Sequence, residues 1–206
     1  MPNIKFAIFD IGDTIYPYTL APLNNLMHTL TSDKIAFEDA HTALDYDYKP
    51  YMKGQLNNHE LAKDLCRFCF VPYNNTLEAQ IINALHQGRG ALFSETLEAI
   101  NLLRLNGIEI GILSNALPAL GDAKIELAKP EYIFTSYELG LLKPDPQIYQ
   151  TMAQKLKTPY NQILFIDDKE RNIIPARELG LNGIVFNRET ILKEITPYLS
   201  KGINNV

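Results

Sequence analysis

A short apolar segment near the start of the chain ends abruptly in an acidic turn. Residues 4–9 are rich in Ile and Phe, and Asp10, Gly12 and Asp13 follow them. A run this short and this apolar predicts a strand buried on both faces. Open α/β sheets carry their reactive side chains at the carboxyl ends of such strands. An Asp is also a common turn residue, so the meaning of Asp10 depends on the rest of the chain.

Strands and helices alternate after residue 91. Ser94 is the expected N-cap of the first helix in this region. Alternation of this kind implies right-handed crossovers and a mostly parallel sheet. We therefore predict an α/β fold, a three-layer Rossmann-like arrangement around a parallel sheet of about five strands. The later strands are expected at 108–113, 132–135, 163–166 and 183–186, and the helices at 97–104, 117–128, 147–156, 173–179 and 190–199.

Residues 16–91 have a different pattern, in which no convincing strand occurs. Asn57 and Glu60 form an expected capping box at the start of one of the helices in this region. We predict a small helical cap domain at 16–91, inserted into a core made of 1–15 and 92–206. The helices are expected at 20–30, 35–46, 58–70 and 75–86.

Composition excludes several classes of protein. The 206 residues include 19 Lys and Arg against 24 Asp and Glu, a net charge of −5, which argues against nucleic-acid or anionic-membrane partners. The first residues do not form a signal peptide, and no apolar run is long enough to span a bilayer. Two cysteines are too few for a disulfide scaffold. A cytoplasmic protein is expected.

Polar side chains follow several of the predicted strands. Asp10, Ser114–Asn115 and Asp167–Asp168 come directly after three strands, and Lys143 lies in the loop after another. Because parallel strands end at the same edge of a sheet, these groups are expected to converge. Three carboxylates would repel one another, and a hard divalent cation such as Mg²⁺ relieves that repulsion. With a Lys and a Ser nearby, the sequence predicts a site for a phosphate-bearing ligand.

The same segments resemble the four motifs of the haloacid dehalogenase (HAD) superfamily, in the order in which that family has them. They are Asp10-Ile11-Gly12-Asp13-Thr14, Leu113-Ser114-Asn115, Leu142-Lys143-Pro144-Asp145 and Phe165-Ile166-Asp167-Asp168. The insert at 16–91 has the position of the family's helical cap between the first two motifs. Three further segments resemble the family's caps and its sugar-phosphatase and epoxide-hydrolase-type branches, namely 51–56, 140–144 and Arg171-Asn172 with Leu179-Gly180.

The resemblance implies a metal site and a nucleophile. Asp10 would attack phosphorus, form an aspartyl phosphate and also bind Mg²⁺. The backbone carbonyl of Gly12 would be a second ligand and Asp168 the carboxylate ligand of the fourth motif. Asp167 would be either a ligand or the residue that holds a metal-bound water.

The resemblance also implies a set of phosphate contacts. Ser114 and the backbone of Asn115 would bind the phosphoryl oxygens. Lys143 would hold Asp10 and the phosphate together by its charge. Asn172 would orient the fourth motif.

One position departs from the family pattern. The phosphatases of the family usually carry a second Asp two positions after the nucleophile, as acid and base, and this chain has Gly12 there. Either Asp13 swings into that role or water donates the proton; loss of a general acid typically costs about 10²–10⁴-fold. The pattern favours Asp13 as a turn residue that faces away.

The resemblance implies a Mg²⁺-dependent phosphatase, acting on a small phosphomonoester such as a sugar phosphate or a nucleotide, with a cap that selects the substrate. The alternative is a catalytically impaired relative that binds a phosphorylated ligand or partner. Dehalogenases of the superfamily also lack the second Asp, but they need no metal and lack an acidic pair such as Asp167–Asp168.

Several other residues of the insert have two possible meanings. Cys66 and Cys69 are either half of a metal or redox site or, as favoured here, part of one buried helix face. The histidines and tyrosines either contact substrate or have solvated, capping and packing roles, and the second is the more common. These residues are His28, His41, His59, His86, Tyr16, Tyr18, Tyr46, Tyr48 and Tyr51.

Overall fold

A five-stranded parallel sheet lies at the centre of the computed structural model, which describes residues 3–31, 46–121 and 129–199. The strand order is β3-β2-β1-β4-β5, and every neighbouring pair is parallel. The predicted α/β fold with about five strands is confirmed. The strands are β1 (Phe6–Phe9), β2 (Glu109–Ser114), β3 (Tyr132–Thr135), β4 (Ile163–Asp167) and β5 (Asn182–Val185).

The register of the sheet brings the ends of three strands together. Phe9, the last residue of β1, pairs with Ile112 of β2 and Ile166 of β4. The backbone N–H of Asp10 then donates to the carbonyl of Ile166 at 2.8 Å. Asp10 therefore leaves the middle of the sheet edge with β2 on one side and β4 on the other.

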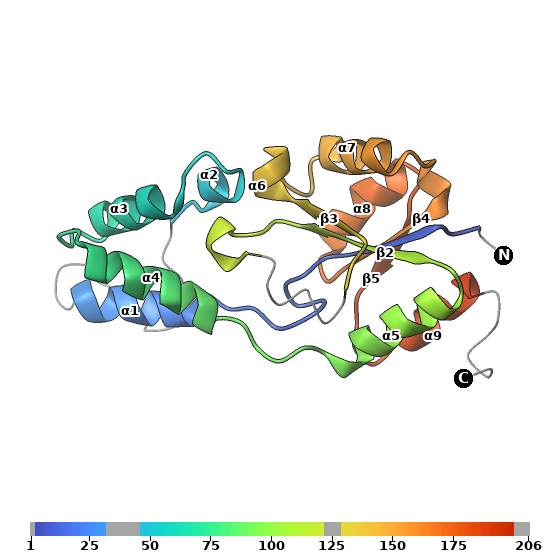
Figure 1. The fold of residues 1–206 in the computed structure, drawn as a ribbon, viewed down its shortest axis with the longest axis horizontal. Helices are drawn as coiled ribbons and strands as arrows, with labels where there is room; N and C mark the ends of the chain where they lie inside the picture. The colour runs from blue at the N-terminus through green and yellow to red at the C-terminus, as the bar shows by residue number, and fades with distance from the viewer. Residues whose placement is uncertain (1–2, 32–45, 122–128, 200–206) are drawn as a thin grey trace.

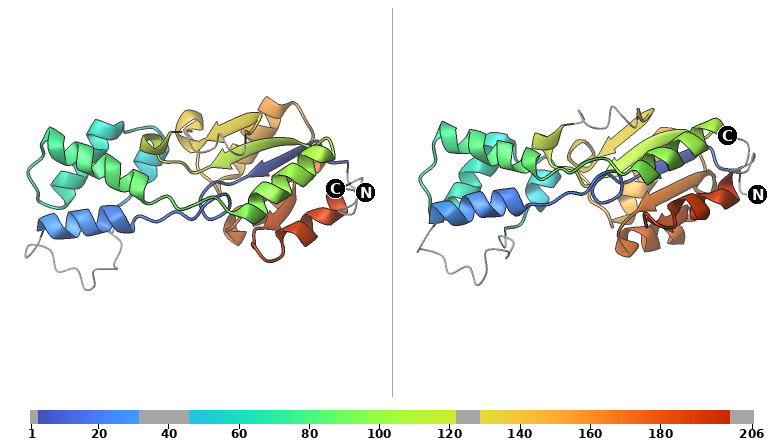
Figure 2. Two further views of the ribbon diagram at one scale, coloured as in Figure 1. Left: turned by 60° about the horizontal axis from the view of Figure 1, so that its bottom comes forward. Right: turned by 90° about the horizontal axis from the view of Figure 1, so that it is seen from below.

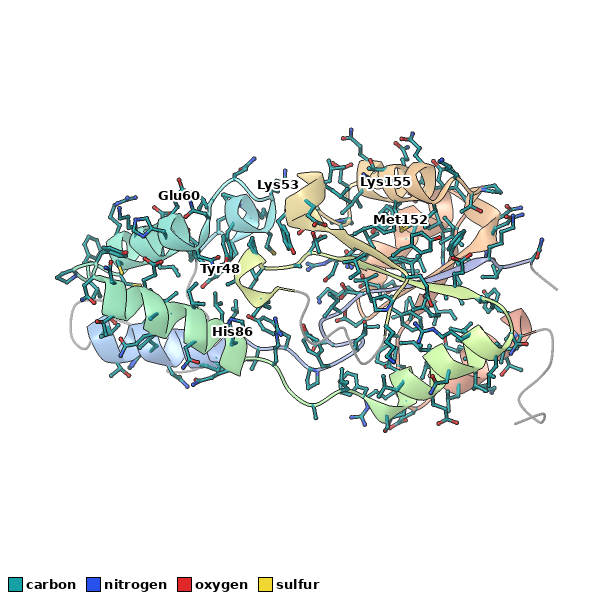
Figure 3. The ribbon with its side chains drawn as sticks, in the orientation of Figure 1. Tyr48, Lys53, Glu60, His86, Met152 and Lys155 are labelled. Atoms are coloured by element: carbon teal, nitrogen blue, oxygen red, sulfur yellow. The ribbon has the colours of Figure 1, made fainter. Side chains whose placement is uncertain are left out.

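Helices cover both faces of the sheet, as expected for three layers. α5 (Ser94–Leu105) and α9 (Ile191–Ile195) lie on one face, and α7 (Pro146–Leu156) and α8 (Glu170–Glu178) lie on the other (Figure 1). Successive residues of β1 serve the two faces in turn, because side chains alternate along a strand. Ala7 and Phe9 pack in the cluster with α5 and α9, whereas Ile8 packs in the cluster with α7 and α8. Met152 points from α7 toward the sheet (Figure 3).

The described part of residues 16–91, called the insert below, forms a separate group of helices beside the sheet (Figures 1 and 2). It contains α1 (Ala21–Thr31), α2 (Lys49–Met52), α3 (Asn58–Phe68) and α4 (Asn75–Gln87), and among its described residues no strand occurs, only bridges of single residues. One apolar cluster joins the helices, and its fully buried members include Leu23, Met27, Leu61, Leu65 and Ile81. Burial of this surface is what stabilises the group.

Local signals in the insert are largely confirmed. The Asn57 side chain accepts from the Glu60 N–H at 2.9 Å and Glu60 accepts from the Asn57 N–H at 2.8 Å, which is the predicted capping box. Cys66 and Cys69 are free and buried in the apolar cluster of the insert, so the packing interpretation holds for them.

Two helix predictions are changed by the structure, and a third is not tested by it. The helix expected at 35–46 lies almost wholly outside the described residues. The helix expected at 117–128 is absent from its described part, where a short 3₁₀ helix, η1 (Pro118–Leu120), ends at Gly121 with φ 53° and ψ −173°, which a helix cannot continue through. Ser94 is the first residue of α5 rather than its N-cap, and its hydroxyl donates to the neighbouring Glu95.

Short elements complete the chain. α6 (Ser136–Leu139) follows β3 directly and was not expected from the sequence. η3 (Tyr160–Gln162) precedes β4, and α9 continues as η4 (Thr196–Tyr198), where Pro197 tightens the turn. No helix in the described ranges combines the length and apolarity needed to cross a bilayer.

Candidate active site

A buried lysine links the ends of β1 and β4. Lys143 Nζ lies 2.7 Å from Asp10 Oδ1 and 2.6 Å from Asp167 Oδ2, and it also donates to the carbonyl oxygen of Leu113 at 2.9 Å. The Lys143 side chain is only 1% exposed. An ammonium group has three N–H donors, and in Lys143 each of them has an acceptor. These hydrogen bonds offset the cost of burying the charge.

Asp167 is saturated by hydrogen bonds from the protein. Its Oδ1 accepts from the Lys169 backbone N–H and from Asn172 Nδ2, both at 2.9 Å. Its Oδ2 accepts from Lys143 Nζ and, at 3.0 Å, from Asn172 Nδ2. A carboxylate accepts about four hydrogen bonds, so the capacity of Asp167 is filled. The expected orienting role of Asn172 toward the fourth motif agrees with these contacts.

Asp168 has far fewer partners. Its carboxylate contacts Lys169 Nζ at 3.2 Å, and that lysine is 42% exposed. Burial raises the pKa of Asp168, Lys169 acts to lower it, and the charges of Asp10 and Asp167 raise it further. Ionisation of Asp168 therefore costs more free energy here than it would in water.

Three carboxylates meet at this point of the sheet edge. Oxygen atoms of Asp10, Asp167 and Asp168 all lie within 4.8 Å of one another. Lys143 neutralises part of this charge, and the remainder, with hard oxygen donors, suits a cation such as Mg²⁺. The convergence expected from the sequence is present in the structure.

The β2 end of the site is built around Ser114 and Asn115. Ser114 is buried at the last position of β2. The Asn115 side chain accepts from the Lys143 backbone N–H and donates to the Lys143 carbonyl, both at 2.9 Å. Asn115 therefore fixes the backbone that carries Lys143. Only the backbone of Asn115 was expected to contribute to the site, because a side-chain contact across 28 residues leaves no local pattern.

Gly12 and Asp13 form the turn after β1. Asp13 has φ 57° and is exposed, and its carboxylate accepts from the Tyr18 N–H at 3.2 Å. This places Asp13 in the turn and outside the cluster of three carboxylates, in agreement with the interpretation of a turn residue. A Cβ atom added to Gly12 would meet Tyr18 Cβ at 3.7 Å, which is ordinary van der Waals contact.

The insert contacts the loop that follows Ser114 and Asn115. Ser136 Oγ donates to the Met52 carbonyl of the insert at 2.7 Å and accepts from the Ala116 N–H at 3.1 Å. The Ala119 N–H donates to the Tyr51 hydroxyl at 2.7 Å. Leu117 is buried in the apolar cluster of the insert. The loop is thus held by the insert as much as by the sheet.

The aromatic and imidazole side chains of residues 16–91 mostly pack in apolar clusters or pair with other groups of the protein. Tyr16, Tyr48 and Tyr51 are buried, and Figure 3 shows Tyr48 at the end of the insert that faces the sheet. His59 pairs with Glu78 at 2.7 Å on an exposed surface. His28 and His86 also have partners, and His41 lies outside the described residues.

Residues 4–180 match the family of haloacid dehalogenase-like hydrolases. Among curated relatives, mouse bifunctional epoxide hydrolase 2 is 32% identical over 108 residues, which is 48% of this chain and 20% of that protein. The (S)-2-haloacid dehalogenase of Pseudomonas fluorescens is 22% identical over 92% of this chain and 87% of its own length. The sesquiterpene phosphatase astK of Aspergillus oryzae is 21% identical over 88% and 89%.

Solved structures share the fold. A HAD family enzyme of Bacteroides thetaiotaomicron, in complex with magnesium and inorganic phosphate, superposes with a TM-score of 0.73 at 19% identity, covering 90% of this chain and 95% of its own. A HAD-like family hydrolase from Porphyromonas gingivalis superposes with a TM-score of 0.76 at 19% identity, covering 95% and 98%. The chain spans about a fifth of mouse epoxide hydrolase 2, so the activity of that whole protein does not transfer to it.

Proposed function

The chain belongs to the haloacid dehalogenase-like hydrolases, and from this premise we propose that it is a Mg²⁺-dependent phosphatase of small phosphomonoesters. The observation that carries the proposal is the meeting of Asp10, Asp167 and Asp168 around the buried Lys143. A sugar phosphate or a nucleotide is the proposed substrate. The insert would act as a cap that closes over the site and excludes water.

The donor set fits magnesium. Asp10 Oδ2 accepts no hydrogen bond within the described residues and Asp168 contacts only Lys169, so both would bind the ion, together with the Gly12 carbonyl. Asp167, which is saturated, would instead orient Lys143 or a metal-bound water. The bound ion would supply charge neutralisation for the phosphoryl group. The magnesium and phosphate held by the Bacteroides enzyme of similar fold support this assignment.

The reaction would proceed in two displacements at phosphorus. An Asp10 oxygen attacks, a new P–O bond forms, and the bond to the leaving alcohol breaks. Water then attacks the aspartyl phosphate, which releases inorganic phosphate and restores the carboxylate. Lys143 offsets the charge at Asp10, and Ser114 with the Asn115 backbone would bind the phosphoryl oxygens. Because Gly12 has no acid and Asp13 is bonded to Tyr18, a water would protonate the leaving oxygen.

Gly12 also supports a second candidate, a phospho-ligand or partner-binding protein with impaired catalysis. Dehalogenation is a third candidate because a dehalogenase is among the relatives. The acidic pair Asp167–Asp168 argues against it, since the charge of that pair calls for a cation.

Hydrolysis of p-nitrophenyl phosphate, with Mg²⁺ and with EDTA, tests the proposal. We expect metal-dependent activity that Asp10→Asn lowers by at least about 10³-fold, because loss of a nucleophile removes the covalent route. Asp64→Asn is the matched control, because Asp64 is a half-exposed residue of α3 whose partners, Arg67 and Tyr46, also lie in the insert. Binding of phosphate without turnover would favour the second candidate, and metal-independent halide release from 2-haloacids would favour the third.

A further inference from the structure

Arg89 lies where the chain leaves α4 and returns to the sheet. It forms a single-residue bridge with Tyr18, and Figure 3 labels His86 at the end of α4 that precedes it. The side chain is half-buried. Arg89 thus belongs to the crossing between the insert and the core, where a substrate held by the carboxylate cluster would meet the insert.

The guanidinium of Arg89 is incompletely bonded. One NH₂ group donates to the carbonyl of Leu120, in the loop that follows Ser114 and Asn115. Its Nε–H is buried and has no acceptor in the described part of the chain. No carboxylate of the described residues forms an ion pair with it, in contrast to Arg67, Arg104 and Arg188.

Tyr16 connects this cation to the site. The Arg89 guanidinium carbon lies 5.9 Å from the centre of the Tyr16 ring. Burial raises the pKa of Tyr16, the charge of Arg89 acts to lower it, and the charge of Asp10 raises it. The charges of Arg89 and Asp10 therefore both act on the Tyr16 hydroxyl, and Arg89 itself follows α4 of the insert.

An arginine in this state suits an oxyanion. A buried N–H without an acceptor costs free energy, and a guanidinium that lacks a carboxylate partner has no neutralising charge. Its planar fork matches a carboxylate or a phosphate through two parallel hydrogen bonds. The free Nε–H points to the same side of the guanidinium as one N–H of the NH₂ group that bonds to Leu120. These two N–H groups would provide such a pair, while the other N–H of that NH₂ group keeps the bond to Leu120.

We propose that Arg89 binds a second oxyanion, a carboxylate or a second phosphate, on the leaving part of the substrate. The inference rests on the proposed phosphatase function and narrows its substrate class to phosphorylated acids and bisphosphates. Neutral sugar monophosphates would lack this contact and would be poorer substrates.

Binding of three non-hydrolysable probes in the presence of Mg²⁺ tests the proposal without turnover. Propylphosphonate carries one anionic group, whereas 3-phosphonopropionate adds a carboxylate and propane-1,3-bisphosphonate adds a second phosphonate. We expect calorimetry to give at least one doubly anionic probe a dissociation constant about tenfold or more below that of propylphosphonate, the size of effect expected for a charge-assisted pair. Which of the two binds more tightly identifies the second group.

The variants separate recognition from structure. Arg89→Gln should bring the ratio of dissociation constants close to one, and Arg89→Lys should keep part of it because the charge remains. Arg67→Gln, at an exposed arginine of α3 paired with Asp64, is the matched control and should keep the wild-type ratio. Equal binding of all three probes by the wild type would overturn the proposal, as would an Arg89→Gln variant that weakens every probe to the same degree.

The same binding measurements distinguish a failure of the phosphatase proposal from a failure of the role proposed for Arg89. If propylphosphonate and both doubly anionic probes fail to bind with Mg²⁺, the site does not take phosphoryl groups, and the phosphatase proposal falls together with this one. If propylphosphonate binds but no probe is preferred, only the role of Arg89 is lost.

Discussion

Two adjacent aspartates at the end of β4 are distinguished by their hydrogen bonds. Asp167 accepts four hydrogen bonds from three groups of the protein, whereas Asp168 contacts, among the described residues, only a half-exposed lysine. A carboxylate whose lone pairs are occupied is a rigid part of the framework, and one that lacks partners is available to a metal ion. The division of roles between them therefore follows from three-dimensional contacts that the dipeptide itself does not reveal.

The glycine at position 12 offers a test of what limits the rate. Room for a Cβ exists there, so Gly12→Asp should fold and supply the acid that the family pattern usually has. We expect kcat for p-nitrophenyl phosphate or an alkyl phosphate to rise by roughly tenfold or more, since general acid catalysis contributes about 10²–10⁴-fold when well placed. The gain should be larger for the alkyl phosphate, because its leaving group is more basic.

Gly12→Asn is the matched control for that experiment. It has nearly the same size as Gly12→Asp but carries no transferable proton, so it should give no gain. If the two variants behave alike, the missing acid does not limit turnover.

Residue identities at the site were accessible from the sequence, but their partners were not. Asp10, Ser114, Asp167 and Asp168 each lie at the end of a strand or directly after it, and that position alone predicts a common edge. The side-chain role of Asn115 and the position of Arg89 depend on contacts between distant segments. No periodicity or motif encodes such contacts.

At the scale of elements, α7 supports the site through α8. Tyr149 of α7 is fully buried and donates its hydroxyl to the backbone carbonyl of Asn172 in α8 at 2.7 Å. Burial and the nearby charges of Asp167 and Asp10 raise the pKa of Tyr149, so the hydroxyl stays protonated as a donor. The helix pair thereby positions Asn172, which in turn holds Asp167.

Tyr149→Phe should lower the free energy of unfolding by about 1 kcal/mol, the typical contribution of one buried hydrogen bond. Urea denaturation measures the loss. Tyr132→Phe is the matched control, because the Tyr132 hydroxyl bonds to Glu109 on an exposed surface and its loss should change stability by less than about 0.5 kcal/mol. Equal losses in the two variants would show that the buried hydrogen bond of Tyr149 stabilises the protein no more than the exposed one of Tyr132.

Prediction of elements succeeded where local chemistry decides the structure. The capping box of Asn57 and Glu60 depends on only four consecutive residues, and α3 begins there as expected. The predicted helix after β2 was wrong in its described part, because the chain there packs on the insert and ends its short turn at Gly121. Tertiary contacts outweighed a weak helical pattern at that point.

At the scale of the whole molecule, Ser136 joins the insert, the loop after β2 and α6. Ser136→Ala would leave the Met52 carbonyl and the Ala116 N–H without their partner. We expect kcat/KM for a phosphomonoester to fall about tenfold and the free energy of unfolding to fall by roughly 1–3 kcal/mol, because buried polar groups without partners are costly. Kinetics well below the melting temperature and urea denaturation measure the two effects separately.

Ser94→Ala is the control for that variant, because Ser94 is exposed and its hydroxyl contacts only the adjacent Glu95. It should leave both quantities close to the wild-type values. A Ser136→Ala protein that loses stability but keeps kcat/KM would show that this contact has no influence on the loop.

The burial of Leu117 among the helices of the insert has a consequence for engineering and for divergence within the family. If residues 16–91 alone were transplanted into a related protein, their apolar cluster would lack Leu117, which is buried in it. The recipient would keep a loop shaped for different helices, next to the position that corresponds to Ser114. Residues 16–91 and the loop after β2 that packs on them therefore have to be exchanged together, although they are separate in the sequence.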